Sequence, residues 1–384
     1  MKEEPGRSHT RYGLVLTGGG ARAAYQVGAL KAIAEITAFD KNPFRIISGY
    51  SAGAINGTWL GSRSESFLAA TQGMWHEWSK ITSKRIFNTK APNVFIIALR
   101  WIRDRVMGGM QGRHAINYLL DTTPLSKFIR TRIDFDSLEE HIKSGQIHAV
   151  SVTAANYNTG HSVTFFSSRE EIENWETLNR ISHRTKISAD HVLASSAIPV
   201  FFPPVKIEEA HYGDGMVRLN TPLSAAVRLG ADKLLVIGIR GPSSTSKPAV
   251  ANSDVTLGEI AGTVLNGLFF DSLDADIARL ERINRAMSSI TEEERILQPD
   301  HLRFIPLLNL RPTQEVGDMS GDELNRLPMM LRFLLKGIGL KANKGLDLLS
   351  YLSFEPKYLN ALLELGYKDT MARRTEIRSF FDLE

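Results

Sequence analysis

The most constraining feature of the sequence is a strand, glycine turn and helix pattern that occurs twice within the first 60 residues. In the first copy an apolar run at 14–16 precedes three glycines at 18–20, and apolar residues then recur at helical spacing over 24–33. In the second copy an apolar run at 44–47 precedes the sequence Gly-Tyr-Ser-Ala-Gly at 49–53, and another helical pattern follows. Two such units in succession predict a parallel sheet covered by helices.

The rest of the chain supplies more strands and helices for the same sheet. Two β-branched runs at 148–154 and 162–166 flank an Asn-Thr-Gly turn, which predicts a hairpin. The remaining expected elements are, in chain order, a helical stretch that ends at Ala197, a strand and turn around 213–215, a helix at 222–229, a strand at 233–239, a helix at 257–287 and a strand at 302–310. These patterns favour an α/β fold.

Charge and cysteine content exclude several classes of protein. Lys and Arg number 46 and Asp and Glu 42, and this excess is too small to indicate nucleic-acid binding. The chain has no cysteine, which excludes disulfides, a thiolate nucleophile and zinc held by cysteine. The first residues contain acids and a proline where a secretory signal needs an apolar run. No stretch reaches the roughly 18 apolar residues of a membrane span. We therefore expect a cytoplasmic protein, at most peripheral to a membrane.

The sequence at 49–53 fits the GxSxG pattern of a nucleophile elbow. In an elbow, Ser51 stands on a tight turn between a strand and a helix, and its hydroxyl projects at the end of the sheet. Gly49 and Gly53 remove side chains that would clash where the strand and helix cross. The helix N-terminus favours developing negative charge. The pattern alone fits a glycine-rich turn with an N-capping serine equally well.

The glycine turn after the first strand has two interpretations. Gly18, Gly19 and Gly20 allow backbone N–H groups to point into one small volume, as an oxyanion hole requires. Alternatively, the first and third of these glycines fit a dinucleotide-binding GxGxxA spacing with Ala23, and Asp40 follows within about 20 residues. A dinucleotide site accounts for the glycines but not for the serine turn one unit later, whereas an acyl hydrolase uses both.

A serine hydroxyl needs a base before it can act as a nucleophile at neutral pH. Histidine is the usual base, and the ten histidines of the chain are scattered singly. Only His211 stays a rival, because it lies close to Asp214 in the sequence. With a histidine base the protein would be an α/β-hydrolase-like esterase with a Ser-His-Asp triad.

Four segments, in this order, resemble those of the patatin-like phospholipase family. They are the glycine loop with its arginine at 18–22, the serine turn at 49–53, the run Ala-Ser-Ser-Ala-Ile-Pro at 194–199, and Asp214-Gly215 followed by Asn220 and Pro222. The resemblance covers roughly 14–310. It implies a three-layer α/β/α fold with a mostly parallel central sheet, to which the composition of the end of the chain adds a helical C-terminal extension.

The resemblance also implies the chemistry of the site. It implies a Ser-Asp dyad without histidine, in which Ser51 attacks an ester carbonyl and Asp214 accepts its proton. The amides of the glycine loop would hold the oxyanion, and Arg22 would anchor that loop. A carboxylate base requires a raised pKa, most simply through apolar burial. No metal or organic cofactor is needed. Without the resemblance, Asp214-Gly215 is an ordinary β-turn pair.

Two residues depart from the family pattern. Ala23 stands where the family's loop usually has another glycine, and Met216 follows Asp214-Gly215 where a smaller residue is more usual. Neither departure removes a reacting group, so both concern local geometry and substrate access.

We expect a serine lipid acyl hydrolase of the phospholipase A or lysophospholipase type, which cleaves carboxylic esters of phospholipids or related acyl lipids through an acyl-enzyme on Ser51. An acyl-lipid substrate and peripheral membrane contact are expected, nucleic acid is not, and the oligomeric state stays open. Besides the triad esterase, a nucleotide-binding oxidoreductase and a non-catalytic membrane adaptor stay as alternatives.

The expected divisions of the chain follow from these patterns. They are a flexible N-terminal tail at 1–12, a catalytic domain at 13–311 with a helical cap region at 62–145 and a surface loop at 241–253, and a helical C-terminal extension at 312–384. Two stripes of bulky apolar and basic residues, at 94–107 and 327–340, suit either an interface-lying helix or packing on the core.

Overall fold

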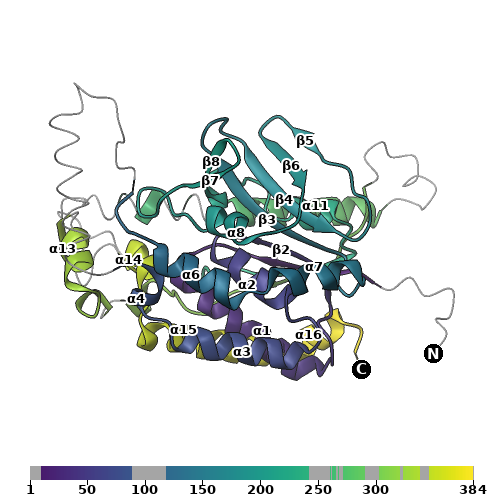
Figure 1. Ribbon diagram of the computed structural model, residues 1–384. Helices are drawn as coiled ribbons and strands as arrows, with labels where there is room; N and C mark the ends of the chain where they lie inside the picture. The colour runs from purple at the N-terminus through teal and green to yellow at the C-terminus, as the bar shows by residue number, and fades with distance from the viewer. Residues whose placement is uncertain are drawn as a thin grey trace.

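The computed structural model describes residues 10–88, 118–241, 260, 262–264, 267, 271–289, 302–320, 323–337 and 346–383. In these residues a central sheet lies between helices that cover both of its faces (Figure 1). The predicted three-layer α/β/α fold with C-terminal helices is confirmed.

Ten strands form the sheet within the described residues. They are β1 (Tyr12–Leu16), β2 (Phe44–Tyr50), β3 (Ala149–Asn156), β4 (Ser162–Ser168), β5 (Glu176–Thr177), β6 (Arg180–Arg184), β7 (Val205–Ile207), β8 (Ala210–Asp214), β9 (Lys233–Ile237) and β10 (Leu307–Leu310). Their order is β10-β9-β1-β2-β3-β4-β6-β5, with β8 paired to β3 and β7 paired to β8. The first five strands of this order are parallel, whereas β4 and β8 are antiparallel to β3. The predicted hairpin is β3–β4.

Helices cover the two faces of the sheet. The α-helices with defined bounds are α1 (Ala24–Thr37), α2 (Ala52–Gly61), α3 (Phe67–Ser79), α4 (Ser83–Ile86), α6 (Thr123–Arg132), α7 (Phe135–Lys143), α8 (Ala189–Ser195), α9 (Ser224–Arg228), α11 (Ser272–Met287), α13 (Met329–Gly337), α14 (Leu346–Leu352), α15 (Pro356–Ala372) and α16 (Arg374–Phe380). Leu14 and Leu16 of β1 belong to the large core with α1 and α2, whereas Val15 belongs to a second core with α9 and α11. This alternation is that of a strand buried on both faces.

The structure differs from the sequence prediction in two places. The stretch before Ala197 contains β5 and β6 as well as α8, although its pattern predicts only helix. Pairing with β4 holds β6 in the sheet, between β4 and the short edge strand β5, and this long-range interaction leaves no local period in the sequence. The last predicted strand begins at Leu307 rather than at 302. Of the predicted helix at 257–287, α11 accounts for the part from Ser272.

The C-terminal helix α15 packs closely against α1. A Cβ atom on Gly28 would overlap the carbonyl oxygen of Leu363, and one on Gly366 would overlap the carbonyl oxygen of Tyr25. The backbones of the two helices therefore touch, and Leu359 of α15 is buried in the same core as α1. Figure 1 shows α15, α1 and α3 together in the layer below the sheet. The end of the chain thus completes the core that the first helix begins.

The close helix crossing makes a prediction about stability. Gly28→Ala and Gly366→Ala each place a methyl group against a carbonyl of the partner helix, and each is expected to lower the free energy of unfolding by about 1–3 kcal/mol. Gly73→Ala in α3 is the control, because its new Cβ meets only Trp59 at 3.7 Å. It should be neutral or stabilise by about 0.5–1 kcal/mol. Urea unfolding measures all three, and equal effects would contradict the close crossing.

Candidate active site

The predicted parts of the site meet at the edge of the sheet where the parallel strands β1, β2 and β3 end. Ser51 directly follows β2, and the glycine loop follows β1, which pairs in parallel with β2. Asp214 ends β8 and pairs with Ala154 near the end of β3. Because β3 lies next to β2, residues from three distant parts of the chain share this edge.

Ser51 stands on a strained turn between β2 and α2. Its backbone has φ 54° and ψ −133°, and such values are uncommon for any residue other than glycine. A Cβ on Gly49 would lie 2.5 Å from the carbonyl oxygen of Gly53, and one on Gly53 would overlap the carbonyl oxygen of Leu16. The two glycines therefore permit the close crossing that the GxSxG pattern predicts. Ser51 occupies the N-cap position of α2, but its side chain makes no capping hydrogen bond to that helix.

The Ser51 hydroxyl instead contacts Asp214. Its Oγ donates a hydrogen bond of 2.6 Å to Asp214 Oδ2, and Met216 N–H donates one of 3.1 Å to Asp214 Oδ1. Ser51 is 2% exposed and Asp214 is 0% exposed. Burial raises the pKa of the Asp214 carboxyl to about 7, although both hydrogen bonds act in the opposite direction. A group with that pKa is suited to accept a proton near neutral pH.

Two serines that the sequence analysis left without a role support the turn. Ser195 Oγ accepts the Ser51 backbone N–H at 2.9 Å and donates to the carbonyl oxygen of Thr153 at 2.6 Å. Ser196 Oγ lies 3.3 Å from the carbonyl oxygen of Ser51. The carbonyl of Ala197 accepts the backbone N–H of Asp214 at 3.0 Å. The run at 194–199 therefore links Ser51 to Asp214, and its only sequence signal was its place in the family pattern.

The glycine loop lies directly against Ser51. A Cβ on Gly18 would be 2.6 Å from the Cβ of Ser51, and one on Gly19 would overlap the side chain of Ile239. Gly19 has φ 152° and Gly20 has φ 56°, which side chains disfavour. The loop therefore needs glycine at Gly18, Gly19 and Gly20 for space, and at the last two of these also for backbone conformation. It then enters a short 3-10 helix at Gly20–Ala23.

Arg22 is buried beneath this loop with an exposed fraction of 1%. Its Nε donates to Ser350 Oγ at 2.7 Å, and its Nη2 donates to Asp347 Oδ1 at 2.9 Å. The guanidinium carbon also lies 4.5 Å from the centre of the Tyr351 ring. The expected anchor of the loop is thus attached to α14.

A buried chain of amides joins the residue before the glycine loop to the end of β9, to α2 and to Trp78 of α3. Gln26 Nε2 donates to the carbonyl oxygens of Thr17 and Ile237, at 2.7 and 3.2 Å. Asn56 of α2 donates to Gln26 Oε1 at 3.0 Å and accepts the indole N–H of Trp78 at 2.9 Å. Satisfied buried networks of this kind fix one arrangement of the packed elements.

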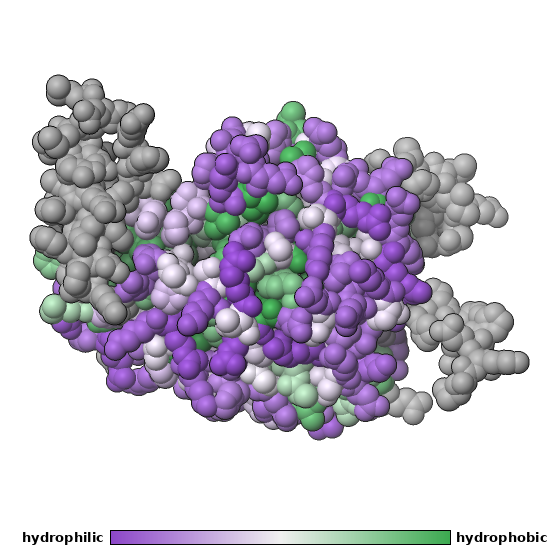
Figure 2. Space-filling model, in the orientation of Figure 1, coloured by the Kyte–Doolittle hydropathy of each residue, from purple (hydrophilic) through white to green (hydrophobic). Residues whose placement is uncertain are grey.

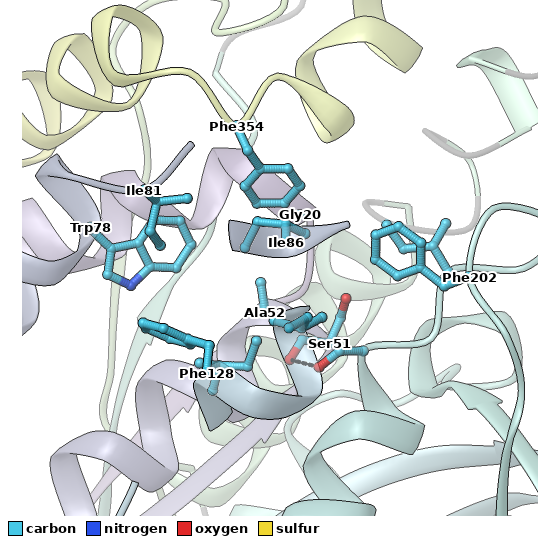
Figure 3. Close-up of a pocket in the computed structure, with 13 residues that line it drawn as sticks. Gly20, Ser51, Ala52, Trp78, Ile81, Ile86, Phe128, Phe202 and Phe354 are labelled. Atoms are coloured by element: carbon cyan, nitrogen blue, oxygen red, sulfur yellow. Dashed lines mark hydrogen bonds between the residues drawn. The ribbon is translucent and has the colours of Figure 1, made fainter. Parts of the chain in front are cut away.

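An apolar pocket opens beside Ser51. Its walls come from α2, α3, α4, α6, the run after α8 and the segment after α14, and its lining includes Trp78, Ile86, Phe128, Phe202 and Phe354 (Figure 3). Apolar side chains also reach the surface near the centre of the face that Figure 2 shows, over the region of α2 and α8. A pocket lined almost entirely by carbon suits a hydrocarbon chain.

The described histidines offer no evident base. His211 lies three residues before Asp214 on β8, so the two side chains leave the strand on opposite faces, and His211 is exposed. His191 is buried, but its Nδ1 takes part in the capping of α8 with Ser188, and burial lowers its pKa to about 4. The dinucleotide alternative is also disfavoured, because Ile239 and the carbonyl of Tyr351 close over the glycine loop.

The membrane-facing candidates are only partly described. The stripe at 94–107 lies outside the described residues, as does the expected loop at 241–253 apart from Gly241. In α13, Leu331 and Leu335 are buried, whereas Met329 and Phe333 are exposed. In the part of the chain that the structure describes, no helix is long and apolar enough to cross a bilayer.

Comparison with known proteins supplies structural relatives of low identity. Human GIVD cytosolic phospholipase A2 is 12% identical with a TM-score of 0.46, and the match covers 97% of this chain and 60% of that chain. VipD from Legionella pneumophila is 14% identical with a TM-score of 0.35, over 96% and 67% of the two chains. This chain thus spans about three fifths of the human enzyme. No curated protein sequence matches it.

The family comparison is more direct. The model of the patatin-like phospholipase family matches residues 14–227, which is more than half of the chain. The match contains the glycine loop, the serine elbow and Asp214. This protein therefore belongs to the patatin-like phospholipase family.

Proposed function

We propose that this protein is a serine lipid acyl hydrolase that cleaves carboxylic ester bonds of phospholipids or related acyl lipids. The observation that carries this proposal is the 2.6 Å hydrogen bond between the Ser51 hydroxyl, in the lining of an apolar pocket, and the buried Asp214 carboxylate. Family membership supports the reaction class. A phospholipase A or lysophospholipase type is the finer form of the proposal.

In the first half of the reaction the lipid acyl chain occupies the apolar pocket. Asp214 takes the proton of Ser51 Oγ as this oxygen attacks the ester carbonyl carbon. The carbonyl oxygen becomes an oxyanion, and backbone amides of the Gly18–Gly20 loop stabilise it. When the C–O bond to the alcohol breaks, the alcohol oxygen takes the proton back from Asp214 and leaves.

The second half repeats these steps with water. Asp214 accepts a proton from water as the water oxygen attacks the acyl-enzyme carbonyl. Collapse of this intermediate breaks the bond to Ser51 Oγ, which recovers the proton, and the fatty acid departs. The strained elbow and its serine supports hold Ser51 Oγ in place, so little reorganisation is needed at either step.

The alternatives predict different behaviour. A triad esterase requires a histidine in contact with Ser51, and the buried base here is a carboxylate. An oxidoreductase would bind a dinucleotide tightly and keep its activity without Ser51. A membrane adaptor would bind lipid but release no fatty acid and react with no fluorophosphonate.

Ser51 is expected to be the site of covalent labelling. A fluorophosphonate probe should label the wild-type protein on Ser51, because the Ser51–Asp214 bond activates that hydroxyl, and Ser51→Ala should lose both the label and fatty-acid release. Ser126→Ala, at a half-buried position of α6 outside the pocket lining, is the matched control and should label normally. Mass spectrometry of the labelled peptides makes the measurement. A label on any other residue would exclude Ser51 as the nucleophile.

Hydrolysis is expected to depend on ionisation of Asp214. Only the carboxylate form accepts a proton, and its pKa is raised to about 7, so kcat/KM should rise with pH and reach half its plateau near pH 7. Asp214→Asn should reduce kcat by about 10²–10⁴-fold and remove this limb. Rates on a fatty-acyl p-nitrophenyl ester between pH 5 and 9 test the prediction. A profile that is flat from pH 5 upward would rule out a carboxylate with a raised pKa as the base.

The same variant provides a check that does not rely on activity. The folded state holds the Asp214 proton more tightly than the unfolded state, whose carboxyl has the ordinary pKa near 3.8. Ionisation of Asp214 therefore opposes folding increasingly as the pH rises from 3.8, the pKa in the unfolded state, to about 7, the pKa in the folded state. Asp214→Asn should raise the melting temperature at pH 8 and have a smaller effect at pH 4.

The glycine loop is expected to be intolerant of side chains. Gly19→Val would place atoms on Ile239 and disfavour φ 152°, so the loop amides would shift. We expect a loss on the order of 10²-fold or more in turnover, as for loss of an oxyanion contact. The rate of hydrolysis of a fatty-acyl p-nitrophenyl ester measures the effect on turnover, and Gly73→Ala is the control. Turnover equal to that of the wild type would refute the oxyanion assignment.

A further inference from the structure

The segment from Leu346 to Glu355 contacts several parts of the site at once. It begins more than 100 residues after the family match ends at 227, and it comprises α14 and the residues that connect α14 to α15. We call it the α14 segment. Figure 3 shows Phe354 of this segment facing the pocket across from Ser51 and Ala52.

The first contact is with the backbone of the glycine loop. The Tyr351 carbonyl oxygen lies so close to Gly20 that a Cβ there would overlap it. Gly20 also has φ 56°, so the loop adopts a conformation that leaves room for α14. The side chain of Tyr351 packs in a small buried cluster with Met216 and Ile239. Met216 borders Gly18 of the loop, and Ile239 borders Gly19.

The second contact is with Arg22. Ser350 Oγ accepts from Arg22 Nε at 2.7 Å and donates to the carbonyl oxygen of Asp347 at 2.6 Å. Asp347 Oδ1 accepts from Arg22 Nη2, and the Asp347 side chain is 43% exposed whereas Arg22 is 1% exposed. A buried guanidinium requires such partners, because it loses its hydration in the interior. Asp347 and Ser350 thus fix the arginine that follows the loop by two residues.

The third contact is with the pocket wall. Ser83 Oγ of α4 lies 3.4 Å from the Phe354 carbonyl oxygen and donates to Glu355 Oε1 at 2.7 Å. Ile86 of the same short helix lines the pocket with Phe354. The α14 segment therefore joins the glycine loop on one side to the acyl pocket on the other.

We propose that the α14 segment is needed for full turnover at the active site. In this proposal Asp347 and Ser350 are positioning residues that hold the oxyanion loop through Arg22. The proposal rests on the proposed hydrolase function. It gives the α14 segment a role in turnover as well as a place in the hydrophobic core. A displacement of the loop by a fraction of an ångström would separate its amides from the oxyanion, while leaving substrate binding in the pocket intact.

Single and double variants test this proposal on the full-length protein. Asp347→Asn and Ser350→Ala should each lower kcat on a fatty-acyl p-nitrophenyl ester about tenfold or more, with KM within about twofold of the wild type. In an Arg22→Gln background neither change should lower kcat further, because both act through the same guanidinium. Asp382→Asn is the matched control. It removes a carboxylate of the C-terminal segment that pairs with Lys233 at the opposite end of the sheet, and kcat should not change.

Amide hydrogen exchange provides a readout independent of activity. Peptides that contain Gly18–Gly20 should exchange faster in Asp347→Asn and Ser350→Ala than in the wild type, and not in Asp382→Asn. Unchanged kcat and exchange in folded variants would overturn the proposal, as would losses of kcat that multiply with Arg22→Gln. A wild-type protein that fluorophosphonates do not label on Ser51 would instead refute the proposed function, and the exchange result would still decide the role of the α14 segment.

Discussion

The burial of one carboxylate, Asp214, sets the requirements that the rest of the site meets. An ionised carboxylate without water is costly unless hydrogen bonds surround it, and here the donors are the Ser51 hydroxyl and the Met216 amide. These two bonds do not fully offset the loss of hydration, so the pKa stays high. The same incomplete compensation weakens the folded state and makes the carboxylate more basic than an exposed one. Complete solvation would return Asp214 to the low basicity of an ordinary aspartate.

Such a group keeps its place only if the backbone around it is rigid. Ser195 bonds to both the elbow and β3, the Ala197 carbonyl holds Asp214, and the Gln26–Asn56 pair joins the first strand to the elbow helix. Each of these polar groups is buried and each has a partner. They act between layers that are otherwise held by apolar contacts, which are strong but not directional. The apolar layers therefore supply stability, and the polar links align Ser51, Asp214 and the glycine loop.

The parts of this arrangement that the sequence predicts are those with local causes. The paired strand, turn and helix units and the Ser51 elbow depend on residues within about ten positions, so their patterns are visible. Asp214 lies 163 positions from Ser51 and by itself resembles a turn residue, so only the family resemblance identified it. The roles of Ser195 and Ser350 arise from pairings between distant segments, and a lone serine in a helical pattern carries no signal of them. The short β6 was missed for the same reason.

The C-terminal helices contribute both to the core and to the site, because α15 packs on α1 and α14 contacts the glycine loop. The glycine crossing places α15 against α1 without intervening side chains, and this fixes where α14 emerges. Because α1 follows the short 3-10 helix that joins it to the glycine loop, the same crossing constrains the distance between that loop and Tyr351. A change deep in the α1–α15 contact would thus displace α14 and Arg22 together, relative to Ser51. In this protein the packing of α15 on α1 thus bears on the position of the glycine loop beside Ser51, although α15 itself does not line the pocket.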